Sequence, residues 1–257
     1  MGVIPFVVAA ALAVTPQQFL LSHQLPNGAF AEASAGADAA LTAWAILGLR
    51  ATRTPVDDIY LRTHEDELRT PTEIALGTLA EAKPSDAIVA RLDRVPVDAA
   101  INVTAWKLLA LARLNRPLPR EGVRFLLDHQ ARSGGWSWAL RGEPDSNDTA
   151  AVVQALRAAR VGGRPVTRGL AFLRRLQNRD GGFELTAGRG SDAQSTAWAV
   201  QAFIAARKDA GRAARRYLAR LRQRDGSYRY NARYAATPVW VTAQVLPALA
   251  RRPFPFG

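Results

Sequence analysis

Apolar residues recur along this chain at steps of three and four, in pairs of segments separated by glycine-containing turns. The clearest amphipathic segment runs from Val166 to Gln177, where Leu170, Leu173 and Leu176 lie beside a row of arginines. This period predicts a helix with one face against a core. A second set of segments is rich in Ala and Leu on nearly all sides, which predicts helices buried inside the molecule. These segments are Ala39–Ala51, Thr149–Ala159, Ser195–Ala206 and Val239–Ala250.

A turn with the pattern Gln-x-x-(Asp/Asn/Ser)-Gly-x-aromatic connects the amphipathic segments to the buried ones. Its copies end at Phe30, Trp136, Phe183 and, in a weaker form, Tyr228, and each is followed after 12 to 14 residues by a Thr-Ala pair. The last three copies are spaced by 47 and 45 residues, which indicates one supersecondary unit repeated along the chain. A residue that recurs in every copy is more often structural than catalytic.

Two less regular units complete the pattern, within residues 57–82 and 86–114. In the second, Thr104-Ala105-Trp106 matches Thr42-Ala43-Trp44. The total of six helical hairpins with apolar inner helices predicts an all-α fold, and we expect a closed α/α toroid in a single domain. An open superhelix is the alternative.

Composition excludes several kinds of chemistry. The chain of 257 residues has no Cys, so disulfides, thiolate metal sites and Cys nucleophiles are excluded. Two of its three histidines, His23 and His129, directly precede the Gln of a turn, and we expect them to end outer helices, where the dipole favours a partly cationic ring. A calcium loop at Asp145 is also excluded, because Ala150 and Leu156 stand where a Gly and a bidentate Glu are needed. No metal and no cofactor is expected.

The net charge of +12 is unevenly distributed. Residues 157–257 carry 19 Arg and one Lys against five acidic residues, whereas residues 1–156 carry a small excess of acids. Solvated arginine faces would give this pattern, and so would a surface for an anionic partner such as a phospholipid membrane or an envelope polymer. Six arginines gather on the last outer segment, with Leu218 and Leu221 as its apolar anchors. Nucleic acid is a poorer fit, because few aromatic residues stand between the arginines.

The N-terminal residues 3–13 form an apolar run that is too short to span a bilayer. Its length, and the small residues Ala11 and Ala13, fit a signal peptide, although no Lys or Arg precedes it. We therefore expect a leader at residues 1–13, a toroid at 14–257, and a secreted or envelope location. A retained leader would place the protein in the cytoplasm.

The turns, each followed by a helix that opens with Asp-x-x-x-Thr-Ala, resemble the repeats of squalene-hopene cyclases, other class II terpene cyclases and protein prenyltransferase β subunits. The likeness extends from Thr15 to Ala250 and implies an α/α barrel. Prenyltransferases bind zinc through Asp, Cys and His, so a chain without Cys cannot build that site. Class II cyclases protonate an alkene with the middle Asp of Asp-x-Asp-Asp-Thr-Ala. The matching position here is Asn147, within Asp145-Ser146-Asn147-Asp148-Thr149-Ala150, and an amide has no acidic proton to donate.

The repeat gives the same motif a structural explanation. Aligned on Thr-Ala, Asp145 corresponds to Asp38 and Asp192, four residues before the Thr. This is the position of an N-cap, and Asp148 at the third helical position would complete a capping box. Asp148 and Asp145 are therefore weak candidates for a catalytic acid.

Five further residues are candidates for binding an apolar ligand. Trp44, Trp106 and Trp198 each lie two residues after a repeat Thr, and Gln154 and Gln201 each lie five residues after one. They would line a central cavity or pack between the inner helices. A pocket into which Asp148 points would favour an enzyme, and a centre filled by Trp and Leu would count against one.

Our leading hypothesis is a catalytically degenerate cyclase-like protein that binds a hydrophobic or anionic ligand outside the cytoplasm. One alternative is an isoprenoid cyclase with Asp148 or Asp145 as its acid. Size also counts against that enzyme, because cyclases of this type usually pair two barrels and this chain has length for one. The other alternative is a scaffold for a protein or an envelope polymer.

Overall fold

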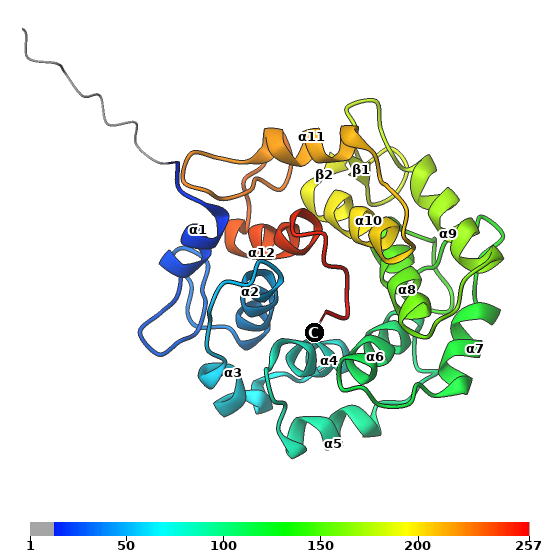
Figure 1. Ribbon diagram of the computed structural model, residues 1–257, viewed down its shortest axis with the longest axis horizontal. Coiled ribbons are helices and arrows are strands. Elements are labelled where there is room, and N and C mark those ends of the chain that lie inside the picture. Colours follow the sequence, from blue (N-terminus) through cyan, green and yellow to red (C-terminus); the bar gives the residue numbers. More distant parts are fainter. Residues whose placement is uncertain (1–12, 257) are drawn as a thin grey trace, which may run out of the picture.

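The computed structural model describes residues 13–256, which form two concentric rings of helices (Figure 1). The outer ring contains α1 (Pro16–Ser22), α3 (Ile59–Thr63), α5 (Asp86–Arg94), α7 (Arg120–Asp128), α9 (Arg164–Arg175) and α11 (Arg212–Leu221). The inner ring contains α2 (Ala39–Ala51), α4 (Pro71–Ala80), α6 (Ile101–Arg113), α8 (Ser146–Ala158), α10 (Ala193–Ala205) and α12 (Pro238–Leu249). A 3-10 turn, η1 (Glu65–Glu67), follows α3, and a small antiparallel hairpin of β1 (Phe183–Glu184) and β2 (Ser191–Asp192) precedes α10. The predicted all-α toroid of six hairpins is confirmed.

The ring is closed by contacts between the last unit and the first. Each inner helix packs against the next, and α12 packs against α2 and α1. The last unit has no Asp at the position of Asp38, and Glu32 of the first unit caps α12 instead, accepting from the N–H groups of Val239 at 3.1 Å and Trp240 at 2.9 Å. These contacts exclude the open superhelix.

The recurring turn is fixed by one hydrogen bond that is the same in four units. The N–H of its aromatic residue donates to the hydroxyl of the repeat Thr, at 2.9 Å from Phe30, Trp136, Phe183 and Tyr228. The turn Gly has positive φ, +91° at Gly181, and a Cβ there would lie 2.5 Å from the carbonyl oxygen of Ala213 on the next outer helix. The recurring Thr and Gly are therefore structural residues.

The prediction that histidines end outer helices is also confirmed, and it extends to the third one. His23, His64 and His129 are the C-caps of α1, α3 and α7. Each ring nitrogen Nδ1 bonds the carbonyl of an aromatic residue four positions earlier at 2.8–2.9 Å, and the two rings pack together.

Among the inner helices, two predicted starts differ from the structure by two or three residues. We expected the inner helices after the second and third turns to begin at Thr149 and Ser195, but α8 begins at Ser146 and α10 at Ala193. An N-cap is followed at once by the first helical residue, so Asp145 and Asp192 set both starts. The leader expected at residues 1–13 lies outside the described residues except for Ala13. Within residues 13–256, no helix has the length and apolar character needed to cross a bilayer.

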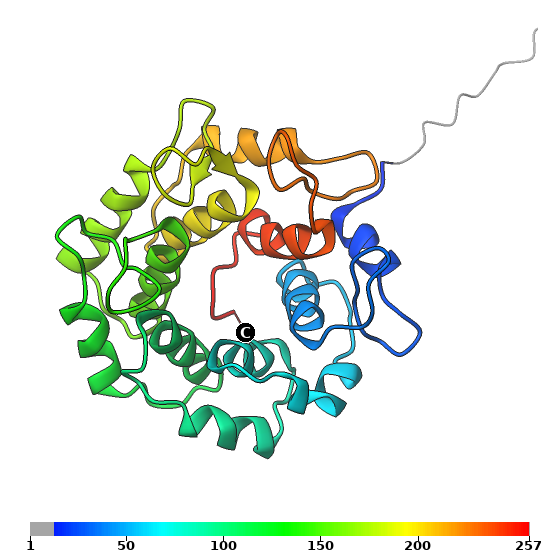
Figure 2. The same cartoon turned by 180° about the vertical axis from the view of Figure 1, so that it is seen from behind.

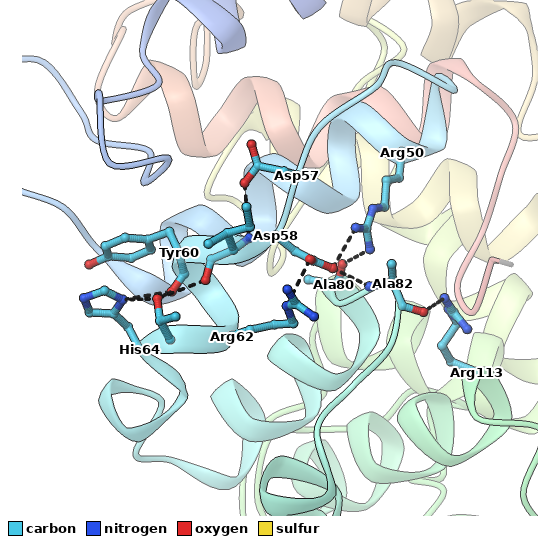
Figure 3. Close-up of polar contacts among 11 residues, drawn as sticks. Arg50, Asp57, Asp58, Tyr60, Arg62, His64, Ala80, Ala82 and Arg113 are labelled. Atoms are coloured by element: carbon cyan, nitrogen blue, oxygen red, sulfur yellow. Dashed lines mark hydrogen bonds and ion pairs between the residues drawn. The ribbon is translucent and has the colours of Figure 1, made fainter.

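An ionic cluster around the buried carboxylate of Asp58 joins α2, α3 and the end of α4 (Figure 3). Asp58 bonds Arg50 at 2.9 Å and the N–H of Ala82 at 2.6 Å, and it pairs with Arg62 at 3.4 Å. Burial on its own raises the pKa of Asp58, but the Ala82 N–H and the Arg50 guanidinium outweigh it, so the pKa lies below its ordinary value. This carboxylate therefore stays charged, and its contacts connect α2, α3 and the residues that follow α4.

Glu81, the C-cap of α4, is fully buried beside this cluster. Neither of its carboxylate oxygens has a hydrogen-bond partner among the described residues. Burial, followed by the nearby charge of Glu65, raises its pKa to about 8. Glu81 is therefore a carboxyl group that the fold keeps protonated near neutral pH.

The threonine bond gives a first prediction. Thr196→Val keeps the branched shape but leaves the buried N–H of Phe183 unpaired, which should lower the free energy of unfolding by about 1–3 kcal/mol. Thr196→Ser keeps the hydroxyl and should cost clearly less. Urea denaturation followed by circular dichroism measures both, and equal losses in the two variants would contradict the role of the hydroxyl.

Glu81 gives a second prediction. Its folded pKa of about 8 lies above its ordinary value of 4.5, so the folded state holds a proton that the unfolded state loses, and stability falls as pH rises between these values. Glu81→Gln should remove this contribution and stabilise the protein at pH 8 by about 1–3 kcal/mol, with a smaller effect at pH 5. Melting temperatures across this range test it, with the exposed Glu143→Gln as control. A variant that is less stable than the wild type at pH 8 would show that the charged form is favoured.

Candidate functional site

The repeat brings the predicted ligand-binding residues together at the centre of the ring. Trp44, Trp106 and Trp198 come from α2, α6 and α10, which alternate around the inner ring, so they meet across its middle. Their ring centroids are 5.6–6.1 Å apart with interplanar angles of 74–87°. This edge-to-face arrangement is the one that aromatic quadrupoles favour.

A fourth aromatic residue completes this cluster from an unexpected place. After α12 the chain turns back, and residues 251–256 enter the ring (Figures 1 and 2). Phe254 is 3% exposed, and its ring centroid lies 5.8–6.3 Å from the ring centroid of each tryptophan. Its N–H donates to Oε1 of Gln154 at 2.8 Å. The sequence left open whether the centre is empty or filled, and the structure fills it with three tryptophans and a Phe of the C-terminal segment.

Gln244 is a residue of the centre that the sequence reasoning missed. It lies two residues after Thr242, the position that Trp44, Trp106 and Trp198 hold in other units, so the alignment contained the signal. Its Oε1 accepts from Nε1 of Trp198 at 2.8 Å and from Gln194 at 3.2 Å. Its Nε2, and Oε1 of the predicted residue Gln201, are buried and have no partner among the described residues. Gln244 therefore brings one unpaired donor to the apolar centre through its contact with Trp198, and Gln201, three residues after Trp198 on α10, carries one unpaired acceptor.

Asp145 does what the repeat predicts. Its Oδ1 accepts from the N–H of Asp148 at 2.9 Å, as Asp38 accepts from Leu41 and Asp192 from Ser195, both at 2.7 Å. Burial is the largest cause of the raised pKa of Asp145, and hydrogen bonds from Asp148 oppose it. The carboxyl is a helix cap in the described structure.

Asp148 does not form the predicted capping box. Its Oδ1 accepts instead from Nδ2 of Asn102 on α6, at 2.5 Å, and Asn102 also accepts from the hydroxyl of Thr72 on α4 at 3.0 Å. Asp148 is 7% exposed, and burial, followed by the charge of Asp145, raises its pKa to about 8. The missed partner Asn102 lies 46 positions away, and only the ring places it beside α8.

Asn147, at the position of the family's acid, is half-buried and accepts from the hydroxyl of Ser146 at 3.3 Å. Within residues 13–256, no group of three or more His, Asp or Glu side chains is arranged to hold a metal ion. The motif at the start of α8 therefore contains one amide, one capping carboxyl and one buried carboxyl that is protonated at neutral pH.

The arginine-rich outer helix α11 is anchored as predicted, because Leu218 and Leu221 are buried. Several of its arginines contact the protein itself. Arg215 pairs with Asp209 at 2.9 Å, Arg220 donates to the carbonyl of Asp180 at 2.6 Å, and Arg222 donates to the carbonyl of Val14 at 2.8 Å. Some of these arginines therefore stabilise contacts between segments of the ring itself.

Comparison with known proteins identified no matching family model and no curated relative. Solved structures do match. A type II terpene cyclase from Scytonema is 16% identical with a TM-score of 0.65, and the match covers 91% of this chain and 95% of that one. Candida albicans protein geranylgeranyltransferase-I, complexed with GGPP, is 13% identical with a TM-score of 0.60, covering 82% and 83%. The ent-copalyl diphosphate synthase from Streptomyces platensis is 19% identical with a TM-score of 0.56, and the match covers 83% of this chain but 50% of that chain.

The coverage of the Scytonema cyclase corrects one expectation. That cyclase chain is close to this one in length, so the room for a single barrel is no argument against a cyclase. The chain spans about half the length of the Streptomyces enzyme. At these identities the likeness establishes the fold alone: the protein has the α/α toroid fold that terpene cyclases and prenyltransferases also have.

Proposed function

We propose that this protein is a binding protein on the terpene cyclase-like toroid, which holds an apolar, isoprenoid-type ligand in its ring and does not cyclise it by protonation. The observation that carries the proposal is the state of the acids at the start of α8. Asn147 has no acidic proton, the Asp145 carboxyl caps the helix, and Asp148 is a weakened acid.

The strength of the acid matters because an alkene is a very weak base. Each unit by which the pKa of a proton donor rises removes about 1.4 kcal/mol of driving force for proton transfer. Burial and the neighbouring Asp145 move the pKa of Asp148 to about 8 from an ordinary value of 3.8. Asp148 is therefore a poorer donor to a carbon–carbon double bond than a carboxyl in water.

Two observations support the ligand class. The centre presents three tryptophans, whose faces and edges suit an apolar chain, and the amide of Gln154 bonds the Phe254 that packs against them. Two of the similar structures hold isoprenoid compounds: the geranylgeranyltransferase binds GGPP, and a variant of the Scytonema cyclase binds geranylgeranyl dihydroxybenzoate. The proposal also includes export, for which the apolar run at residues 3–13 is the support, and an anionic partner for the arginine-rich half.

A second candidate is an isoprenoid enzyme in which Asp148 is the acid. The observation that favours it is that Asp148 keeps its proton at neutral pH, as a general acid must. Such an acid suits an oxygen leaving group better than an alkene.

One experiment separates these candidates. The full chain is mixed with geranylgeranyl diphosphate or squalene, binding is followed by tryptophan fluorescence, and products are analysed by mass spectrometry. We expect saturable binding without a cyclised product, and at least tenfold weaker binding in Trp106→Ala. The exposed Trp138→Ala is the matched control and should bind like the wild type. A cyclised product that disappears in Asp148→Asn would overturn the proposal in favour of the enzyme.

The capping role of Asp145 is tested separately by stability. Asp145→Ala removes the acceptor for the first N–H groups of α8 and should lower the free energy of unfolding by about 1 kcal/mol. Asp145→Asn keeps an acceptor oxygen and should cost less. Chemical denaturation compares them. If Asn is as damaging as Ala, the negative charge of Asp145 has a role beyond the cap.

A further inference from the structure

We infer that residues 251–256 occupy the ligand site of the ring and must leave it before a ligand binds, and that this ligand is an apolar molecule with a hydroxyl group. The inference rests on the proposed function for the identity of the site. It adds the segment that competes for the site and the polar group that the ligand carries.

Residues 251–256 make apolar contacts in the centre of the ring. Phe254 fills the space between the three tryptophans, and Phe256 stacks on it with centroids 5.0 Å apart and an interplanar angle of 23°. The guanidinium of Arg252 lies over the Phe256 ring at 5.6 Å. These are the contacts that a hydrophobic ligand would make with the same surface.

Few main-chain hydrogen bonds attach this segment to the ring. Pro253 and Pro255 have no N–H group to donate. Beyond Arg252, the described main chain donates one hydrogen bond to the ring, from Phe254 to Gln154. A segment held mainly by side-chain burial separates without breaking a hydrogen-bond ladder, so it is suited to be displaced.

Two buried amide atoms have no hydrogen-bond partner while the segment occupies the ring. Oε1 of Gln201 and Nε2 of Gln244 lie on the neighbouring helices α10 and α12, both residues are 1% exposed, and neither atom has a partner in the described part of the chain. Each unpaired buried group costs about 1–3 kcal/mol. The segment is therefore an incomplete match for the site it fills.

The chemistry of these two atoms defines a better occupant. A Gln Oε1 only accepts and a Gln Nε2 only donates, whereas a hydroxyl group does both. A hydroxyl on an apolar body can pair with either amide, because it both donates and accepts, while the body takes the place of the phenylalanine rings. A pure hydrocarbon would leave the same groups unpaired. An isoprenoid alcohol has the required combination.

Tethering explains why the segment would occupy the site in the absence of ligand. A group attached to the same chain competes at an effective concentration in the millimolar range. The apparent affinity for a ligand equals the affinity of the open site multiplied by the fraction of molecules whose site is open. A chain that ends at residue 252 should therefore bind geranylgeraniol at least tenfold more tightly than the full chain.

The test compares the two chains by tryptophan fluorescence, with geranylgeraniol as probe and squalene as the hydrocarbon without a hydroxyl. A synthetic peptide of residues 252–257 should bind the shortened chain and compete with geranylgeraniol. Gln201→Leu in the shortened chain removes the unpaired acceptor and keeps the hydrogen bond between Trp198 and Gln244. It should weaken geranylgeraniol binding by about tenfold, and by clearly more than it weakens squalene binding, because only the alcohol can donate to the amide. Equal affinity of the full and shortened chains for geranylgeraniol would overturn the inference and leave the proposed function intact. Peptide binding to a shortened chain that binds no isoprenoid would instead overturn the proposed function, together with the ligand class inferred here.

A second measurement keeps the test decisive if the shortened chain does not fold. Because the protein has no Cys, Phe256→Cys introduces a unique thiol in the full chain. Geranylgeraniol should accelerate its reaction with a thiol reagent several-fold as the segment leaves the ring. The exposed Ala35→Cys is the control and should react at the same rate with and without the alcohol. A Phe256→Cys thiol that reacts equally fast or more slowly with saturating ligand would show that the segment stays in place.

Discussion

The hydrogen bond from a turn N–H to the hydroxyl of a repeat Thr determines most of this structure. It fixes the end of each turn onto the first helical turn of the inner helix, at 2.9 Å in four units. In three of these units the turn Gly lies against backbone at the start of or within an outer helix of the next unit, as Gly181 does against Ala213. Each of these turns thus positions the unit that follows, and the contacts of every inner helix with the next, including α12 with α2, close the chain into a ring.

Closure creates a centre in which equivalent positions of the units face each other. Two residues after the repeat Thr, three units place Trp and one places Gln244, and the Trp198–Gln244 hydrogen bond shows that these positions meet. A change at this position in one unit therefore alters the contacts that other units make in the centre. This arrangement separates the roles of the sequence: residues common to the units build the ring, and residues that differ between them determine what its centre can bind.

This division also explains what could be predicted from the sequence. The helices, the turns and the cap at Asp145 follow from local signals, and the recurrence of those signals predicted the closed ring. The contact of Asn102 with Asp148 and the cap that Glu32 provides for α12 depend on which units become neighbours in space. The entry of Phe254 into the ring had no counterpart in other units, so no alignment of the repeat could reveal it. The missed features are the ones in which the units of this ring differ from one another.

The position of Asp148 shows how the same burial that could make an enzyme can also prevent the chemistry. A carboxyl removed from water and placed beside Asp145 keeps its proton, which is the protonation state that an acid catalyst needs. The environment that retains the proton also makes it harder to give away, unless a positive group stabilises the anion that is left. At Asp148 the described stabilising partner is the neutral amide of Asn102. Because Asp148 is a protonated but weak acid, we propose binding of an apolar molecule, and not carbocation formation, as the role of the tryptophan-lined centre.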